Sequence, residues 1–100
     1  MNNIKQLSYE ELQNWRAEER DFQLIDVREI DEHEAYNIGG VLLPMSVIFQ
    51  HTDRLDTTKP IVLYCKRGIR SQLAIQRLAP HFPDADFYNL TGGILHLFLA

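Results

Sequence analysis

The chain has 100 residues, of which 45% are hydrophobic and 24% charged, and its formal net charge is -4. This length suits one small domain with one core, so we expect residues 1–100 to form a single domain. The acidic balance disfavours nucleic acid or an anionic membrane surface as the main partner. The sequence has no apolar run of ~20 residues and no signal-peptide core at its start. A single cysteine forms no internal disulfide, and we therefore expect a cytoplasmic protein.

The pattern of apolar residues predicts short strands that alternate with helices. Ser8 and Glu11 form a capping-box signature, so a first helix should begin after Ser8. We expect strands at 22–27, 41–43, 61–64 and 87–90, and further helices at 29–36, 47–55, 71–78 and 94–99. Leu73 is expected to face the core. This alternation is typical of an α/β fold, a parallel sheet with helices on both faces.

Cys65 directly follows the most strand-like run, 61–64, and five residues separate it from the helix predicted to start at Ser71. In parallel sheets, functional sites form at this place, where a strand ends and a loop enters a helix. Gly68 allows the loop backbone to curl. A curled loop gathers N–H groups around an anion, and the unpaired N–H groups of the helix start point the same way.

Three cations, Lys66, Arg67 and Arg70, crowd into the same loop. Together with the N–H groups they favour a thiolate on Cys65 and would attract an anionic substrate. A lone cysteine is most often a buried core residue. Core packing does not require a cationic, glycine-containing loop, however, so we interpret Cys65 as a reactive thiol.

Two chemistries suit a thiolate in an anion cradle: attack on a phosphate ester, and acceptance of a sulfane sulfur that is kept as a persulfide. The spacing from Cys65 to Arg70 is Cys-x4-Arg, one residue shorter than the Cys-x5-Arg loop of cysteine phosphatases. A tighter ring suits one sulfur atom better than a tetrahedral phosphate. No general acid for a leaving alkoxide is obvious, although Asp26 and Glu29 stay open. Phosphatase or arsenate-reductase chemistry is therefore the least favoured alternative.

The sequence resembles the rhodanese homology domain in three stretches, at Leu24–Glu29, Cys65–Ser71 and Tyr88–Ile94. The resemblance implies a mainly parallel five-stranded sheet with helices on both faces and a six-residue active loop that begins at Cys65. It assigns the catalytic role to Cys65. It assigns the substrate-binding role to Lys66, Arg67, Gly68, Ile69, Arg70 and Ser71, of which Ser71 opens the helix.

The activity that the resemblance implies is transfer of sulfur from thiosulfate or a similar donor to cyanide or a thiol, through a Cys65 persulfide and without a metal or organic cofactor. Lys66 and Arg67 would attract the anionic donor, and Arg70 would touch its sulfonate or brace the loop. One alternative is a persulfide carrier that passes sulfur between partner proteins in a relay. Another is a non-catalytic interaction module, against which the presence of Cys65 argues.

The chain departs from the family pattern at Tyr36–Val41, where members usually have Gly-His-Ile-Pro-Gly-Ala. It also lacks the tryptophan that many members carry soon after the Gly-Gly turn, where this chain has Ile94–Phe98. Both departures bear on substrate preference and rate more than on fold.

Several polar residues outside the loop have simpler interpretations. Asp26 and Arg28, at a strand end, are expected to support the site structurally through charge-assisted hydrogen bonds. The acidic stretch 29–34 is expected to be a solvated helix face, and 94–99 a core helix. The histidines show no paired spacing that would predict a zinc site; they are His33, His51, His81 and His96.

Overall fold

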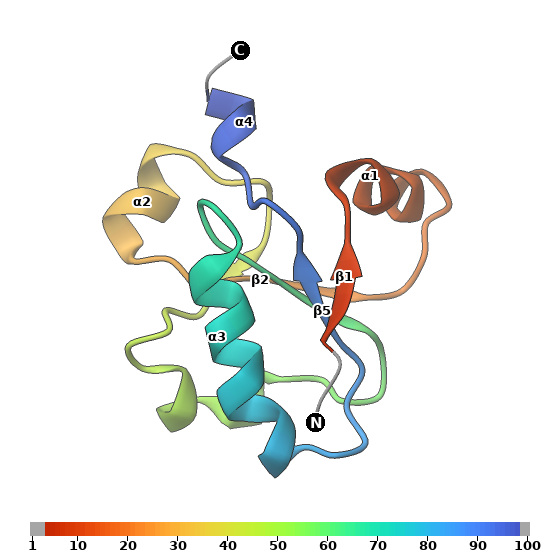
Figure 1. Cartoon of the computed structure of the whole chain (residues 1–100), viewed down its shortest axis with the longest axis vertical. Coiled ribbons are helices and arrows are strands. Elements are labelled where there is room, and N and C mark those ends of the chain that lie inside the picture. Colours follow the sequence, from red (N-terminus) through yellow and green to blue (C-terminus); the bar gives the residue numbers. More distant parts are fainter. Residues whose placement is uncertain (1–3, 99–100) are drawn as a thin grey trace.

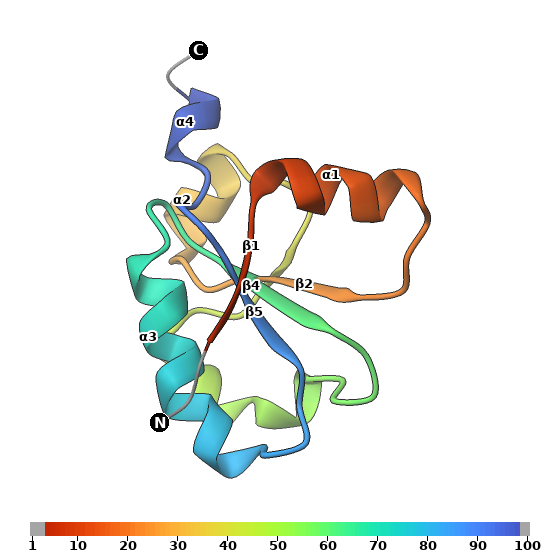
Figure 2. The ribbon, with the colours of Figure 1, turned by 45° about the vertical axis from the view of Figure 1, so that its right-hand side comes forward.

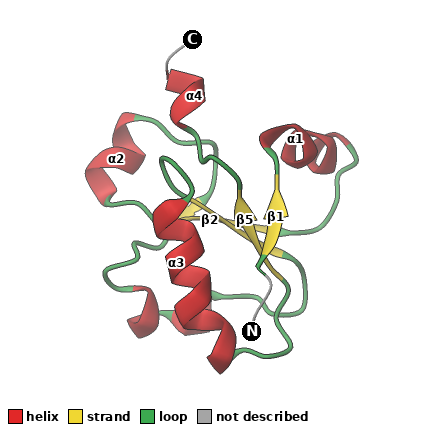
Figure 3. Cartoon of the chain, in the orientation of Figure 1, coloured by secondary structure: helices red, strands yellow, loops and turns green. Residues whose placement is uncertain are grey.

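The computed structural model of the chain describes residues 4–98, which form a five-stranded sheet packed between helices (Figures 1 and 3). In chain order the elements are β1 Lys5–Leu7, α1 Tyr9–Ala17, β2 Gln23–Asp26, α2 Ile30–Ala35, β3 Val41–Leu42, β4 Ile61–Tyr64, α3 Ile69–Leu78, β5 Phe87–Leu90 and α4 Leu95–Phe98. Short 3-10 turns lie at Ile48–Gln50, Thr52–Arg54 and Ala79–His81.

The strand order is β1-β5-β4-β2-β3, and each pairing between these strands is parallel. The predicted α/β fold is therefore confirmed. Because the strands run in one direction, their carboxyl ends share one edge of the sheet, and β4 brings Cys65 to the middle of that edge. Strand β1 was not predicted from the sequence, since only Leu7 of its three residues is buried and three residues are too few to show an alternation.

The alternation of side chains along β4 separates two cores, one on each face of the sheet. Ile61, Leu63 and Cys65 belong to the core beneath α3. Val62 and Tyr64 belong to the second core, which residues of α1 close from the opposite face. Figure 2 shows α1 and α3 on the two sides of the sheet. The thiol of Cys65 thus points to the face that α3 covers.

The prediction of a helix at 47–55 is wrong. This segment forms two 3-10 turns, separated by His51, whose φ of -135° and ψ of 31° are not helical. Ile48 and Leu55 are nevertheless buried in the core beneath α3. The spacing of the apolar residues in this segment therefore reflects their burial and not a helix.

Three smaller expectations about helices also need correction. Helix α3 begins at Ile69, two residues before the predicted start at Ser71, because Gly68 already caps it. Leu73 is 37% exposed and does not face the core. The apolar end of the chain buries Ile94, but none of the α4 residues is buried, and Leu99 lies outside the described residues. Within residues 4–98, no helix is both long and apolar enough to span a bilayer.

Candidate functional site

Cys65 lies at the carboxyl end of β4, under the first turn of α3. Its Sγ accepts hydrogen bonds from the backbone N–H of Gly68, at 3.1 Å, and of Ser71, at 3.3 Å. The Ser71 hydroxyl is also 3.3 Å from Sγ. Backbone donors at the positive end of a helix favour negative charge on the atom they surround. The loop backbone therefore gathers two N–H groups around this sulfur, those of Gly68 and Ser71.

Gly68 is the residue at which the loop backbone turns and the loop ends. Its φ is 85°, a left-handed conformation that side chains other than glycine rarely adopt, and it precedes the first residue of α3. A Cβ at this position would also lie 3.1 Å from the Gly92 nitrogen and 3.2 Å from the Leu90 carbonyl oxygen. Both the conformation and the close neighbours thus favour glycine here.

The turn after β5 holds the Cys65 loop from the other side. The Ile94 N–H donates to the carbonyl oxygens of Cys65, at 3.2 Å, and of Lys66, at 3.0 Å. The Leu95 N–H donates to the same Lys66 oxygen at 2.9 Å. Two stretches that lie far apart in the sequence are therefore joined by backbone hydrogen bonds, which hold the loop independently of its own side chains.

Asn89, in β5, is a site residue that the sequence analysis did not single out. It is 2% exposed, and its Oδ1 accepts a hydrogen bond from the Ser71 hydroxyl at 2.5 Å. Its Nδ2 donates to the Gly68 carbonyl oxygen at 3.3 Å. Asn89 thus braces both residues whose N–H groups contact the sulfur. An asparagine within an otherwise apolar buried strand is the sequence signal that marks such a position.

The pocket over the thiol gathers the loop side chains that the sequence predicted. Besides Cys65, it is lined by Lys66, Arg67, Ile69 and Arg70 from the loop and by Glu32 from α2. Cys65 itself is only 1% exposed, so the sulfur lies at the base of this pocket. Ile69 is 72% exposed and presents an apolar side chain at the rim.

Arg70 is bound to Glu32, a contact that the sequence did not predict. Two hydrogen bonds join the guanidinium to the carboxylate, at 2.7 and 2.9 Å. The hydrogen bond from Arg70 lowers the pKa of Glu32 from 4.5 to about 2. The acidic stretch is therefore not entirely a solvated face, since Asp31 and Glu34 are exposed while Glu32 ties α2 to the Cys65 loop.

Asp26 and Arg28 form a buried ion pair behind the pocket. Asp26 accepts from the Arg28 backbone N–H at 2.9 Å and from its guanidinium at 2.9 and 3.0 Å, and His33 Nδ1 lies 2.9 Å from the same carboxylate. Burial alone would raise the pKa of Asp26, but the hydrogen bonds from Arg28 and His33 outweigh it and hold this pKa below its usual value. The network links β2 to α2 and so positions the helix that carries Glu32.

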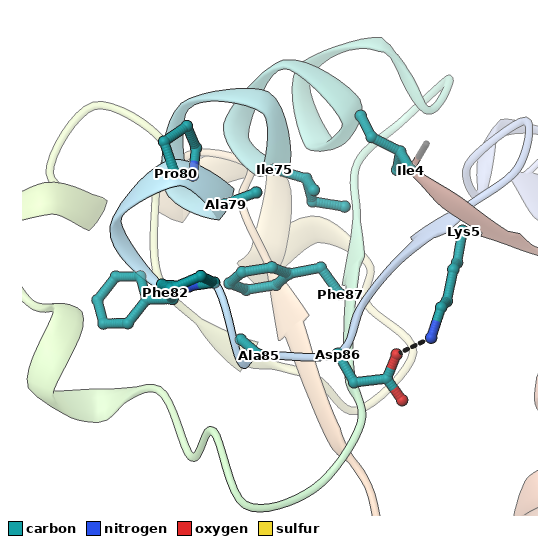
Figure 4. A pocket seen from close by; sticks show the side chains of 10 residues that line it. Ile4, Lys5, Ile75, Ala79, Pro80, Phe82, Ala85, Asp86 and Phe87 are labelled. Atoms are coloured by element: carbon teal, nitrogen blue, oxygen red, sulfur yellow. Dashed lines mark hydrogen bonds and ion pairs between the residues drawn. The ribbon is translucent and has the colours of Figure 1, made fainter. Parts of the chain in front are cut away.

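A second pocket lies at the opposite end of the sheet and contains none of the predicted site residues (Figure 4). Its wall includes the apolar side chains of Ile75, Phe82 and Phe87, and the Lys5–Asp86 ion pair, 2.5 Å long, also lines it. No cysteine, serine, threonine or histidine is among the residues that line it. Among residues 4–98, no group of three or more His, Cys, Asp and Glu side chains is arranged to hold a metal ion.

Comparison with known proteins agrees with this geometry. The family model described as "Rhodanese-like domain" matches residues 8–97. The chain is 41% identical over 91 residues to the uncharacterized protein YqhL of Bacillus subtilis, covering 90% of this chain and 69% of that protein. It is 34% identical over 91 residues to the thiosulfate sulfurtransferase GlpE of Coxiella burnetii, covering 89% of this chain and 82% of that protein.

The fold comparison gives the same result. A crystal structure of a rhodanese-like domain protein from Staphylococcus aureus superposes with a TM-score of 0.82 at 26% identity, covering 91% of this chain and 88% of the other. Family match, relatives and fold thus coincide with a cysteine loop at the carboxyl edge of a parallel sheet. The chain belongs to the rhodanese-like domain family.

Proposed function

We propose that this protein is a sulfurtransferase that moves a sulfane sulfur from thiosulfate or a similar donor to cyanide or a thiol, with Cys65 as the persulfide carrier. The observation that carries the proposal is the position of Cys65 Sγ, which two backbone N–H groups contact at the base of a pocket with three loop cations. The similarity to a thiosulfate sulfurtransferase supports the same class of reaction.

The first half-reaction would load the cysteine. The Cys65 thiolate attacks the outer sulfur of thiosulfate, the S–S bond of the donor breaks, and sulfite leaves with the bonding electron pair. The product is a persulfide anion whose charge the cationic pocket stabilises. Lys66 and Arg67, both on the pocket lining, attract the donor.

The second half-reaction would empty the cysteine. Cyanide or a thiolate attacks the terminal sulfur of the persulfide and takes it, and the Cys65 thiolate is restored as the leaving group. Electrons and charge balance across the two steps without an external oxidant or reductant. Gly68 and Ser71 donate to the inner sulfur in the resting site, so the same N–H groups serve the regenerated thiolate.

Intact mass spectrometry tests this proposal. After incubation with thiosulfate, the wild-type protein should gain the mass of one sulfur atom, and cyanide should remove it. Cys65→Ser should gain nothing. Stoichiometric loading with slow turnover on cyanide would instead identify a persulfide carrier, and no loading of a free, reduced Cys65 would reject the thiosulfate assignment.

A further inference from the structure

The pocket over Cys65 contains one acidic side chain among its cations. Glu32 reaches in from α2 and lines the same pocket as the thiol. Its side chain is 28% exposed, and the Arg70 hydrogen bond holds its pKa near 2, so the carboxylate is ionised at neutral pH. A site built only to attract anions would not need a negative charge at this place.

Glu32 changes the pocket in two ways. It occupies the Arg70 guanidinium with two parallel hydrogen bonds, the geometry that a donor sulfonate would otherwise use. It also places a negative charge beside the path of an incoming anion. This repulsion grows with the charge of the donor, so a doubly charged donor experiences about twice the penalty of a singly charged one.

We propose that Glu32 is a specificity-determining residue, which lowers the preference of the Cys65 pocket for doubly charged sulfur donors such as thiosulfate relative to singly charged ones. The inference rests on the proposed sulfur-transfer function and narrows its substrate class. Singly charged donors of the right chemistry are persulfide and thiosulfonate anions, which carry a transferable outer sulfur without the second charge of thiosulfate.

Two donors that load the same sulfur isolate the effect of charge. Thiosulfate is a dianion, and methanethiosulfonate is a monoanion. In each case the Cys65 thiolate attacks the outer sulfur and the donor S–S bond breaks. The leaving group is sulfite from the first donor and methanesulfinate from the second. The ratio of their second-order loading rates, thiosulfate over methanethiosulfonate, therefore reports how the pocket treats one extra negative charge.

Glu32→Gln keeps the size of the side chain and one acceptor for Arg70 but removes the charge. Coulomb's law, for one extra charge roughly 7 Å from the carboxylate in a half-exposed site, predicts a rise of about three- to tenfold in the rate ratio. Glu34→Gln is the matched control. It changes the net charge equally and lies on the same helix, but it is exposed and outside the pocket lining. Its ratio should equal that of the wild type.

The outcomes separate the two proposals. A raised ratio in Glu32→Gln alone, which shrinks as salt screens the charges, supports the specificity role. An unchanged ratio overturns it, because Glu32 would then only brace the loop and its loss would slow both donors alike. A lowered ratio overturns it as well, because removal of the charge would then disfavour the doubly charged donor. If neither donor loads wild-type Cys65, the proposed function itself is wrong. This result is distinct from a change, or no change, in the rate ratio of Glu32→Gln.

Discussion

Gly93 offers the sharpest test of how the Cys65 loop is held. A Cβ built on Gly93 would lie 2.3 Å from the Lys66 carbonyl oxygen and 2.5 Å from that of Cys65. Real Cβ atoms essentially never come within 3.0 Å of such neighbours, so Gly93→Ala must displace this backbone by about 0.7 Å. The displaced atoms include the carbonyl group of Cys65, the residue that carries the thiol.

Gly92→Ala provides a matched control for this substitution. Both glycines have positive φ, 75° at Gly92 and 64° at Gly93, so alanine at either position costs about 1 kcal/mol in backbone strain. A Cβ on Gly92 meets nothing within 4 Å. Gly93→Ala should cost about 2–3 kcal/mol more, since it also weakens the hydrogen bonds from Ile94 and Leu95 to the loop carbonyls.

The two variants should differ more in activity than in stability. A misplacement approaching 1 Å at a reacting group can reduce rate by about 10²-fold, so Gly93→Ala should load sulfur from thiosulfate far more slowly than Gly92→Ala. Urea unfolding measures the stability of each variant, and intact mass against time measures loading. Equal loading rates in the two variants would show that contact with Gly93 does not position the thiol.

Three further predictions concern the residues around the loop. Asn89→Ala should lower the free energy of unfolding by about 1–3 kcal/mol and slow sulfur loading, since Ser71 loses its acceptor; urea unfolding and mass spectrometry measure both. Asp26→Asn should cost about 3–5 kcal/mol in thermal or urea unfolding, because Arg28, 1% exposed, would keep a buried charge without its counter-ion. The lowered pKa of Glu32 stabilises the fold above pH 4.5, and this contribution is lost as pH falls from 4.5 to about 2. Over that range, the free energy of unfolding should fall by about 1–2 kcal/mol more in the wild type than in Glu32→Gln. The effect is smaller than the full pKa shift would give, because solvent screens part of the interaction.

The sequence allowed the position and curl of the Cys65 loop to be predicted because its residues follow one another closely in the chain. An apolar strand, a cysteine, a glycine and three cations follow one another within ten residues, and each has a direct physical meaning. The β4 strand was predicted with its observed bounds, Ile61–Tyr64, and β5 likewise at Phe87–Leu90. Both strands are buried on two faces, so their composition alone identifies them.

Contacts between distant segments were not predictable in the same way. Glu32 looked like one acid among several on a helix, and only the placement of α2 beside the loop shows that it binds Arg70. Asn89 lay inside the stretch Tyr88–Ile94 that resembles the family, but its partner Ser71 follows only from the packing of α3 against β5. The failure at 47–55 has the opposite cause, because burial of Ile48 and Leu55 produced a spacing that resembled a helix.

The three stretches that carried the family resemblance meet at one loop, and this explains why they occur together. The first stretch supplies the Asp26–Arg28 pair, which binds His33 of α2 and so places Glu32 in the pocket. The third supplies the glycine turn under Cys65. The shape of the loop thus depends on its neighbours, while its charge depends on its own side chains and Glu32. Substitutions in the neighbours should therefore slow loading from every donor, and substitutions of the pocket charges should instead change the preference between donors.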